Sequence, residues 1–589
     1  MKQFNRRTFI KSIIASSVLI SSPQNSFAIQ DIQKRKKTEE LSGNTFYLSI
    51  NKTIVNITGK PTFATTVNDM LQGPTLRWKE GEEVTIHVTN NLDEDTSIHW
   101  HGIILPYKMD GVPGISFKGI KPKETFTYKF KVEQSGTYWY HSHSGFQEQT
   151  GVYGSIIIDP IEKDPYDYDK EYIIALSDWS DEKPRSIYRN LKLQADYYNF
   201  QQLTVSDFWD DVKEDGFVVA FNKRKMWNEM RMNSRDISDV TGYTYTYLIN
   251  GLPSKIPFKA LFESGEKILL RFINSAAMTF FDVRIPDLKM TVVAADGNNI
   301  QPVSVDEFRI GVAETYDVIV EPKKNNSYAI FAQSIDRSGY ALGILTSDIN
   351  SLPIIPQMDK ISNLTHADMG MNMEHNMMAM EKENDHQMQN MQQMDHSKHS
   401  MHEKHMNSST SLNKKAKIPI TKIEESTGYQ TDMRVQNPQY RLNDPGIGLR
   451  DNGRRVLSYV DLKSLRSTKE DKYPDREIVL RLTGNMERYM WSINGIAYKD
   501  AKPLMFKYGE RLRITYINDT MMNHPMHLHG LWSDLETGDD NYLPRKHTVV
   551  VQPGSKISFR VTVDAKGEWA YHCHLIYHMT DMFRKVIVT

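Results

Sequence analysis

Three segments of the chain share a pattern of apolar and polar positions. Each begins with a Gly-Glu pair, continues into a short run of alternating or apolar residues, and ends in an asparagine. The three glycines are Gly81, Gly265 and Gly509, and the three asparagines are Asn90, Asn274 and Asn518. A period of two after a turn predicts a half-buried strand of an antiparallel sheet. Three copies of one strand pattern predict an all-β chain with three β-sandwich domains.

Histidines occur at matched positions in the first and third copies. His99 and His527 each lie 18 residues after the glycine of their copy, and each opens a His-x-His-Gly sequence. In the second copy the corresponding places hold Val283 and Ile285. We therefore expect the second domain to be a spacer without metal ligands.

These patterns divide the chain into five segments. The expected segments are a leader over 1–28, a first domain over 44–160, a second over 161–350, an insert over 357–415 and a third domain over 416–589.

The leader has the organisation of an export signal. Arg6 and Arg7 precede an apolar stretch from Phe9 to Ile20, and Ser26-Phe27-Ala28 resembles a cleavage site. The paired arginines favour the twin-arginine route, and a Sec signal with adjacent arginines is the alternative. The apolar stretch is too short to span a bilayer, and we find no other run of about 18 apolar residues. We expect a periplasmic protein with no membrane span.

The segment between Met358 and Met406 differs in composition from the rest. It holds 12 of the 29 methionines and 7 of the 19 histidines, and it has no aromatic residue. Such a segment cannot bury enough apolar surface to offset its ordering entropy, which predicts disorder. A Met-rich amphipathic helix is the alternative, although the methionines follow no period of 3.6 residues. Thioethers and imidazoles could also bind additional copper on this insert.

Charge and cysteine content exclude several classes of function. The 72 Lys and Arg residues balance 73 Asp and Glu residues, for a net charge of -1, so we expect no nucleic-acid partner. Cys573 is the single cysteine, which excludes an intramolecular disulfide.

Ten of the histidines outside the insert form four clusters. They are His99 and His101; His141 and His143; His524, His527 and His529; and His572, His574 and His578. On a strand, His-x-His places both imidazoles on one face. Imidazole suits copper, iron, nickel and zinc, and copper binds most tightly of these. Only His87 and His547 remain outside the clusters and the insert.

Cys573 lies between two histidines of the fourth cluster. Because neighbours on a strand point to opposite faces, Cys573 can bind a different ion from the one bound by His572 and His574. Two histidines, one cysteine and a weak axial methionine form a blue-copper site. A buried structural thiol is the alternative.

Four sequences are similar to the four copper motifs of multicopper oxidases. They are His99-Trp-His101-Gly, Tyr140-His141-Ser-His143, His524-Pro-Met-His527-Leu-His529-Gly and His572-Cys573-His574-Leu-Ile-Tyr-His578. The leader, the insert and the sequence Asn485-Met486-Glu-Arg-Tyr-Met490-Trp-Ser resemble the bacterial periplasmic copper-resistance protein A group.

The resemblance implies three cupredoxin-like domains with Greek-key topology and four copper ions per chain. The implied ligands are His524, Cys573, His578 and the axial Met582 for type 1 copper; His99 and His527 for type 2; and His101, His141, His143, His529, His572 and His574 for the type 3 pair. Cys573 would also carry electrons between the sites.

The sequence departs from the family pattern at two places. The axial methionine usually stands ten residues after the cysteine, where this chain has Phe583, and Met582 is one residue early. Either a shortened loop still brings Met582 to the copper, or the axial position has no ligand. Asp110 matches one acidic residue that relays protons in related enzymes, with a simple turn residue as the alternative. Met579 replaces the other acidic residue.

Methionine content also bears on the substrate. Outside the insert, the relevant residues are Met226, Met230, Met232, Met486, Met490, Met521 and Met522. Thioethers prefer Cu(I), although methionine is also a common filler of cores. We interpret the chain as a periplasmic cuprous oxidase with Cu(I) and dioxygen as substrates. The alternatives are a laccase-like oxidase of phenols and a copper-sequestering protein, and a periplasmic copper chaperone is a further candidate partner.

Overall fold

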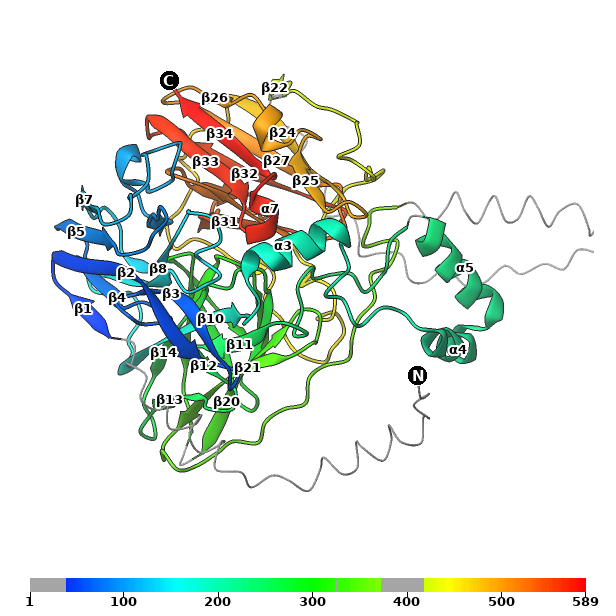
Figure 1. Cartoon of the computed structure of the whole chain (residues 1–589), viewed down its shortest axis with the longest axis horizontal. Coiled ribbons are helices and arrows are strands. Elements are labelled where there is room, and N and C mark those ends of the chain that lie inside the picture. Colours follow the sequence, from blue (N-terminus) through cyan, green and yellow to red (C-terminus); the bar gives the residue numbers. More distant parts are fainter. Residues whose placement is uncertain (1–38, 230, 324–325, 372–417) are drawn as a thin grey trace, which may run out of the picture.

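The computed structural model describes residues 39–229, 231–323, 326–371 and 418–589. The expected leader and residues 372–415 of the expected insert lie outside the described residues. The described chain is built mainly from strands, arranged in six sheets, as the all-β prediction required (Figure 1).

The first domain contains two sheets, of order β1-β4-β9-β8-β6 and β3-β2-β5-β7. Its elements are β1 Glu40–Ser42, β2 Thr45–Asn56, β3 Pro61–Val67, β4 Thr75–Lys79, β5 Glu83–Asn90, β6 His99–His101, η1 Tyr107–Met109, β7 Thr125–Lys131, β8 Gly136–His141 and β9 Tyr153–Asp159. Neighbouring strands are mostly not consecutive in sequence, so the chain crosses repeatedly between the two sheets.

The second domain contains sheets of order β12-β11-β10-β14-β19-β16-β17 and β13-β21-β20-β15-β18. Its strands are β10 Lys170–Trp179, β11 Thr246–Ile249, β12 Leu252–Pro253, β13 Phe258–Leu261, β14 Ile268–Asn274, β15 Phe281–Arg284, β16 Met290–Ala295, β17 Asn298–Val305, β18 Glu307–Ile310, β19 Thr315–Val320, β20 Ser327–Ser334 and β21 Tyr340–Thr346.

The third domain contains one sheet of order β22-β24-β27-β32-β29-β30, which β23 and β25 extend, and a second of order β26-β34-β33-β28-β31. Its elements are β22 Ile420–Thr421, β23 Gln439–Tyr440, η3 Tyr459–Asp461, β24 Arg476–Asn485, β25 Met490–Ile493, η4 Tyr498–Asp500, β26 Leu504–Phe506, β27 Arg511–Asn518, β28 His524–Leu528, β29 Ser533–Leu535, β30 Arg545–Lys546, β31 Thr548–Val551, β32 Ser555–Thr562, β33 Gly567–Cys573, α7 Ile576–Met579 and β34 Phe583–Val588.

The repeated asparagines have the same structural role in all three domains. Each is fully buried at the end of its strand, donates its amide N–H groups to at least two backbone carbonyls, and accepts the N–H of the residue two positions on. Asn518, for example, donates to the carbonyls of Met522 and Val551 at 2.7 and 3.0 Å. A buried amide with every partner satisfied orients the following loop. In the first and third domains that loop leads to β6 and β28, which carry histidines.

Three helices in the second domain were not predicted. They are α3 Pro184–Leu193, α4 Val205–Asp215 and α5 Phe217–Glu229. In α3, Ile187 and Leu191 are buried, and Lys192 donates to the carbonyl of Tyr489 in the third domain at 2.7 Å. Figure 1 shows α3 beside α7 of the third domain, so this helix covers one side of the region where the fourth histidine cluster lies.

The start of the expected insert is packed against the body of the protein. Asp359 contacts Arg284 and Arg454, while Leu364 and Met369 are buried. A carboxylate held by two arginines and two buried apolar side chains therefore anchor this part of the segment to the folded domains. Across the described residues, no helix has both the length and the hydropathy needed to cross a membrane.

Candidate metal centre

The four histidine clusters converge from two domains that lie far apart in sequence. β6 and β8 of the first domain are paired with His99 opposite His141, and β28 and β33 of the third domain are paired with His527 opposite His572. Each ladder places two ligand-bearing strands side by side. The imidazole rings of His99 and His529, one from each domain, stack at 4.0 Å, so the site lies at the interface of the two domains.

The eight histidines of the His-x-His pairs form three groups of closely spaced ring nitrogens. Ligand atoms lie within 4.8 Å of one another in the sets His99, His101 and His527; His101, His141 and His574; and His143, His529 and His572. Among the described residues, the groups with metal-ligand spacing all come from the first and third domains. The middle domain has the buried Val283 on β15 in the corresponding place.

Several ring nitrogens at this centre are buried without a hydrogen-bond partner. They include Nε2 of His99, His143 and His527 and Nδ1 of His101 and His574. Nε2 of His529 lies 3.0 Å from Nε2 of His572, and Nε2 of His574 lies 3.2 Å from Nε2 of His141. Because buried polar atoms are almost always satisfied, converging free nitrogens of this kind fit metal ligation.

Burial favours the neutral form of most of these imidazoles. It lowers the pKa of His101, His141 and His143 well below the usual value, and neighbouring histidines add to the effect. It lowers the pKa of His572 to about 3. A neutral imidazole offers a free lone pair, which a metal ion requires.

A separate group of three ligand atoms comes from Cys573, His524 and His578, and we call it the Cys573 group. The Sγ atom of Cys573 lies 3.5 Å from Nδ1 of His524 and 3.8 Å from Nδ1 of His578, and these two nitrogens are 3.3 Å apart. All three residues are fully buried. Burial raises the pKa of the Cys573 thiol, so a bound cation would be needed to stabilise the thiolate. Trp491 stacks on the His578 ring at 3.8 Å and restricts its orientation.

Strand pairing separates the roles of Met582 and Phe583. His572 lies directly opposite Phe583 in the β33–β34 ladder, and their rings stack with centroids 5.4 Å apart. The next residues, Cys573 and Met582, are linked by a backbone hydrogen bond of 3.1 Å. Residues opposite one another share a face of the sheet, so Met582 lies on the face of Cys573 and Phe583 on that of His572. Met582 is fully buried.

Asp110 lies between histidines of two different groups. Its carbonyl oxygen accepts the Nδ1–H of His99 at 2.8 Å, and its carboxylate oxygen Oδ2 lies 3.0 Å from Nδ1 of His529. The side chain is only 2% exposed. A residue that only formed a turn would not need a buried carboxylate in contact with a histidine of the other domain.

Sequence reasoning missed three residues that contact the histidines from outside. Glu148, in the loop after β8, places Oε2 at 2.7 Å from Nδ1 of His141. Asp239 of the second domain places Oδ2 at 2.6 Å from Nε2 of His578. His547 contacts His101 and His527. No motif marks these residues, because only the fold brings them to the ligands.

Comparisons with known proteins agree with this architecture. Models of the multicopper oxidase family match residues 49–163, 199–348 and 471–589. Copper resistance protein A from Escherichia coli is 52% identical over 99% of both chains. Copper resistance protein A from Pseudomonas syringae pv. tomato is 50% identical, also over 99% of both. Multicopper oxidase MmcO from Mycobacterium tuberculosis is 28% identical and covers 98% of this chain and 95% of its own.

Solved structures show the same fold. The multicopper oxidase Fet3p superposes with a TM-score of 0.62 at 19% identity, over 93% of this chain and 90% of its own. The laccase from Botrytis aclada gives a TM-score of 0.60 at 20% identity, over 93% and 88%. The family matches cover more than half of the chain, and a full-length relative shares half of its residues. The chain therefore belongs to the multicopper oxidase family, the oxidoreductases that its copper motifs resemble.

Proposed function

We propose that this multicopper oxidase is a periplasmic cuprous oxidase of copper resistance. It would oxidise four Cu(I) ions to Cu(II) and reduce one dioxygen, with four protons, to two waters. Resident copper supplies the redox steps when bound, because each ion changes charge by one electron while dioxygen needs four. The names of the two copper resistance relatives support the physiological setting.

We propose the ligand sets that the resemblance implies, for four copper ions per chain. The support is the donor chemistry: two imidazoles and one thiol in the Cys573 group, and eight imidazoles in the larger group. Met582 is the proposed axial ligand, since it shares a face of the sheet with Cys573. Cys573 joins the two groups covalently, because His572 and His574 are its neighbours in the chain.

A cavity near the ligands of the Cys573 group is the observation that supports Cu(I) as the substrate. The cavity has a volume of about 410 Å³, and the residues that line it include Met232, Met486, Met521 and Asp236. Thioethers select Cu(I) over harder ions, whereas a phenol would require an apolar or aromatic wall.

Two short connections join this cavity to the ligands around Cys573. Met521 is followed closely by His524, and the hydroxyl of its neighbour Thr520 lies 2.7 Å from Nε2 of His524. On the other side, Asp239 follows Asp236 by three residues and hydrogen bonds to His578. Both imidazoles are therefore within a few bonds of the cavity wall, which supports electron entry from an ion bound there.

Protons must reach the larger histidine group from solvent. We assign this role to Asp110, which contacts His99 and His529. Glu148, at His141, is the proposed second carboxylate, in place of the acidic residue that Met579 replaces. Burial raises the pKa of Glu148 well above its usual value, which favours the protonated form that a proton relay requires.

The insert and the leader complete the proposal. The methionines and histidines between Met358 and Met406 would bind extra copper and raise its local concentration. The twin-arginine sequence at Arg6 and Arg7 would direct export, with a copper chaperone as a candidate donor in the periplasm.

The test changes the thioethers of the cavity and leaves the ligands intact. The variant Met486→Leu with Met521→Leu should raise the KM for Cu(I) roughly tenfold, a loss of about 1.4 kcal/mol of binding. The kcat/KM for dimethoxyphenol should stay within about a factor of two of wild type, because the variant leaves the proposed copper ligands unchanged. Met290→Leu, which alters a buried methionine of β16, is the matched control.

Two outcomes would contradict the proposal. Equal losses for Cu(I) and phenol would show that the thioethers support the fold and do not select the substrate. A wild-type kcat/KM larger for phenol than for Cu(I) would favour the laccase-like alternative. Oxygen uptake should also show four Cu(I) consumed per dioxygen.

A further inference from the structure

His547 is one of the two histidines that the motifs leave unassigned, and it lies against the larger histidine group. It connects β30 to β31 and is 2% exposed. Its ring meets that of His101 edge to face, with centroids 4.7 Å apart and an interplanar angle of 81°. The other unassigned histidine, His87, instead stacks on Tyr47 at the surface of the first domain.

His547 contacts two of the candidate ligands, His527 and His101. Its backbone carbonyl accepts the Nδ1–H of His527 at 2.7 Å, which leaves Nε2 of His527 free. Its own Nδ1 lies 3.2 Å from Nε2 of His101. The remaining nitrogen of His101, Nδ1, is buried without a partner. His101 is thus turned the opposite way from His99 and His527, which present Nε2.

The chain leaves space for this contact at Gly102. This glycine follows His101 with a φ of +78°, and a Cβ atom built there would lie 2.5 Å from Cδ2 of the His547 ring. A side chain at this position would therefore displace the ring, so the glycine of His-Trp-His-Gly is required by the packing of His547 as well as by its backbone conformation.

The middle domain holds the segment that carries His547. Asp296, in the turn between β16 and β17, accepts the backbone N–H groups of His547 and Thr548 with Oδ2, both at 3.1 Å. The same oxygen lies 3.0 Å from Nζ of Lys546, which is fully buried and also contacts Glu314 at 3.0 Å. Three successive residues of the third domain are thus fixed by one carboxylate of the second.

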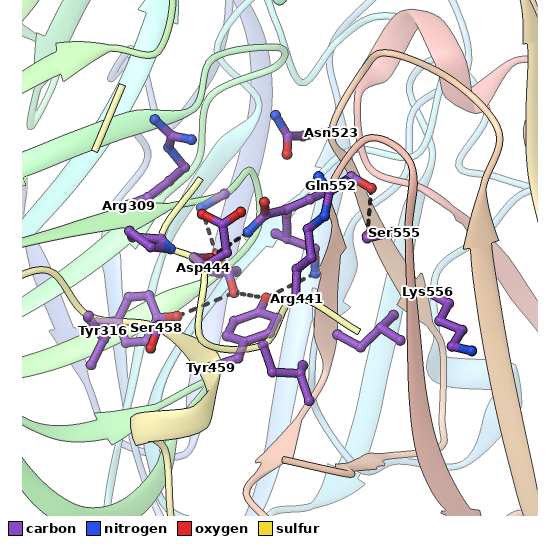
Figure 2. A pocket seen from close by; sticks show the side chains of 17 residues that line it. Arg309, Tyr316, Arg441, Asp444, Ser458, Tyr459, Asn523, Gln552, Ser555 and Lys556 are labelled. Carbon is purple, nitrogen blue, oxygen red and sulfur yellow. Dashed lines mark hydrogen bonds between the residues drawn. The ribbon is translucent and has the colours of Figure 1, made fainter. Parts of the chain in front are cut away.

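The contacts of Asp296, Lys546 and Glu314 extend to a pocket between the second and third domains. Tyr459, one of the residues that line the pocket in Figure 2, donates its hydroxyl to Oε1 of Glu314 at 2.7 Å. The same hydroxyl accepts the backbone N–H of Val550 on β31 at 3.0 Å. The backbone of this segment is therefore held at His547 and on the β31 side of it.

We propose that His547 is a positioning residue that accepts a hydrogen bond from Nε2–H of His101 and thereby selects Nδ1 of His101 as the metal-binding nitrogen. Asp296, from the domain that has no ligands, holds His547 in place. This inference rests on the proposed ligand role of His101. Partners that orient a ligating imidazole typically change metal affinity 10- to 100-fold when they are removed.

The test measures copper retention in the copper-loaded, full-length enzyme. Variants His547→Leu, His547→Phe and His547→Asn are exposed to a competing chelator, and the copper remaining per chain is measured by atomic absorption while the blue colour reports the Cys573 site. Leu and Phe should weaken copper retention at the histidine group roughly 10- to 100-fold and leave the blue colour. Asn should retain copper close to wild type, because its side-chain oxygen can occupy the place of Nδ1. His87→Leu is the control and should behave as wild type.

Three results would overturn the inference. Retention in both the Leu and Phe variants at the wild-type level would show that His101 needs no such partner. Equal loss in the Asn variant would show that the ring acts by packing alone. Loss in Thr548→Val without loss in the His547 variants would identify Thr548, whose hydroxyl is also 3.2 Å from Nε2 of His101, as the partner. A wild-type enzyme that binds copper only at the Cys573 site would instead refute the proposed ligand set itself.

Discussion

Removal of the buried charge of Lys546 tests how the middle domain supports the third. Nζ of Lys546 lies 3.0 Å from both Asp296 and Glu314, and all three side chains are buried. Lys546→Met keeps a side chain of similar length but leaves two buried carboxylates without their cation. Breaking a buried ion pair by removing one partner typically costs about 3–5 kcal/mol.

The surrounding hydrogen bonds place this variant at the lower end of that range. Asp296 keeps backbone N–H donors from Thr315, His547 and Thr548, and Glu314 keeps the N–H of Gly311 and the hydroxyl of Tyr459. Neutral donors offset part of the uncompensated charge, so we expect a loss of about 3 kcal/mol. For a cooperative unit of about 150–250 residues, this corresponds to a Tm lower by roughly 6–12 °C.

The assay is thermal unfolding of the copper-free protein, so that metal binding does not contribute. Burial acts to lower the pKa of Lys546, but Asp296 and Glu314 raise it above its usual value. A group with a raised pKa stabilises the fold fully below its unfolded pKa of about 10.4 and loses this effect as the pH rises through its folded pKa. The difference in stability between wild type and Lys546→Met should therefore be constant from pH 7 to 9 and should become smaller at more alkaline pH.

A control and a second variant make the reasoning refutable. Lys129→Met removes an exposed partner of Glu83 and should cost less than about 1 kcal/mol. Adding Glu314→Gln to Lys546→Met should recover part of the loss, because one unpaired charge is removed. A Tm for Lys546→Met within about 2 °C of wild type would refute the assignment of an ion pair across the domain interface.

Three further predictions concern the proposed redox sites. Cys573→Ser should abolish the blue absorption, because it removes the single thiol of the chain; a blue variant would refute the type 1 assignment. His143→Ala should keep the blue colour and lose oxygen uptake, measured with an oxygen electrode, and surviving uptake would show that the residue is not a ligand. Deletion of residues 372–406, which spares the packed segment before them, should raise the KM for Cu(I) at limiting copper and leave kcat within about a factor of two. Because the histidines must be neutral to bind, the increase should be larger at pH 7 than at pH 5, and an unchanged KM would assign the insert another role.

The sequence predicted the elements whose signals are local. Strands were identifiable because side chains alternate with period two, and the three Gly-Glu repeats appear in the structure as β5, β14 and β27. The His-x-His pairs predicted two imidazoles on one face for the same reason. The three helices of the second domain were missed, since the repeat pattern does not extend to residues 184–229.

The axial position illustrates a question that spacing left open. The sequence favoured Met582 as the axial ligand over an unligated site, but the family distance from Cys573 falls on Phe583. The register of β33 and β34 places Phe583 beside His572 and leaves Met582 on the face of Cys573. Register depends on the pairing of two strands, which no single segment specifies.

The sequence by itself determined the candidate ligands, because a metal site needs particular side chains at short spacings along strands. Only the tertiary structure decided which residues outside the motifs hold those ligands. His101 and His547 are 446 residues apart, and Asp239 and His578 are 339 apart, yet each pair is in hydrogen-bond contact. Contacts of this kind arise when domains pack against one another, and neither partner carries a local pattern that marks it. The middle domain looked like a spacer in the sequence for this reason. In the structure, however, Asp239 of this domain contacts the candidate ligand His578, and Asp296 holds His547, which contacts the candidate ligand His101.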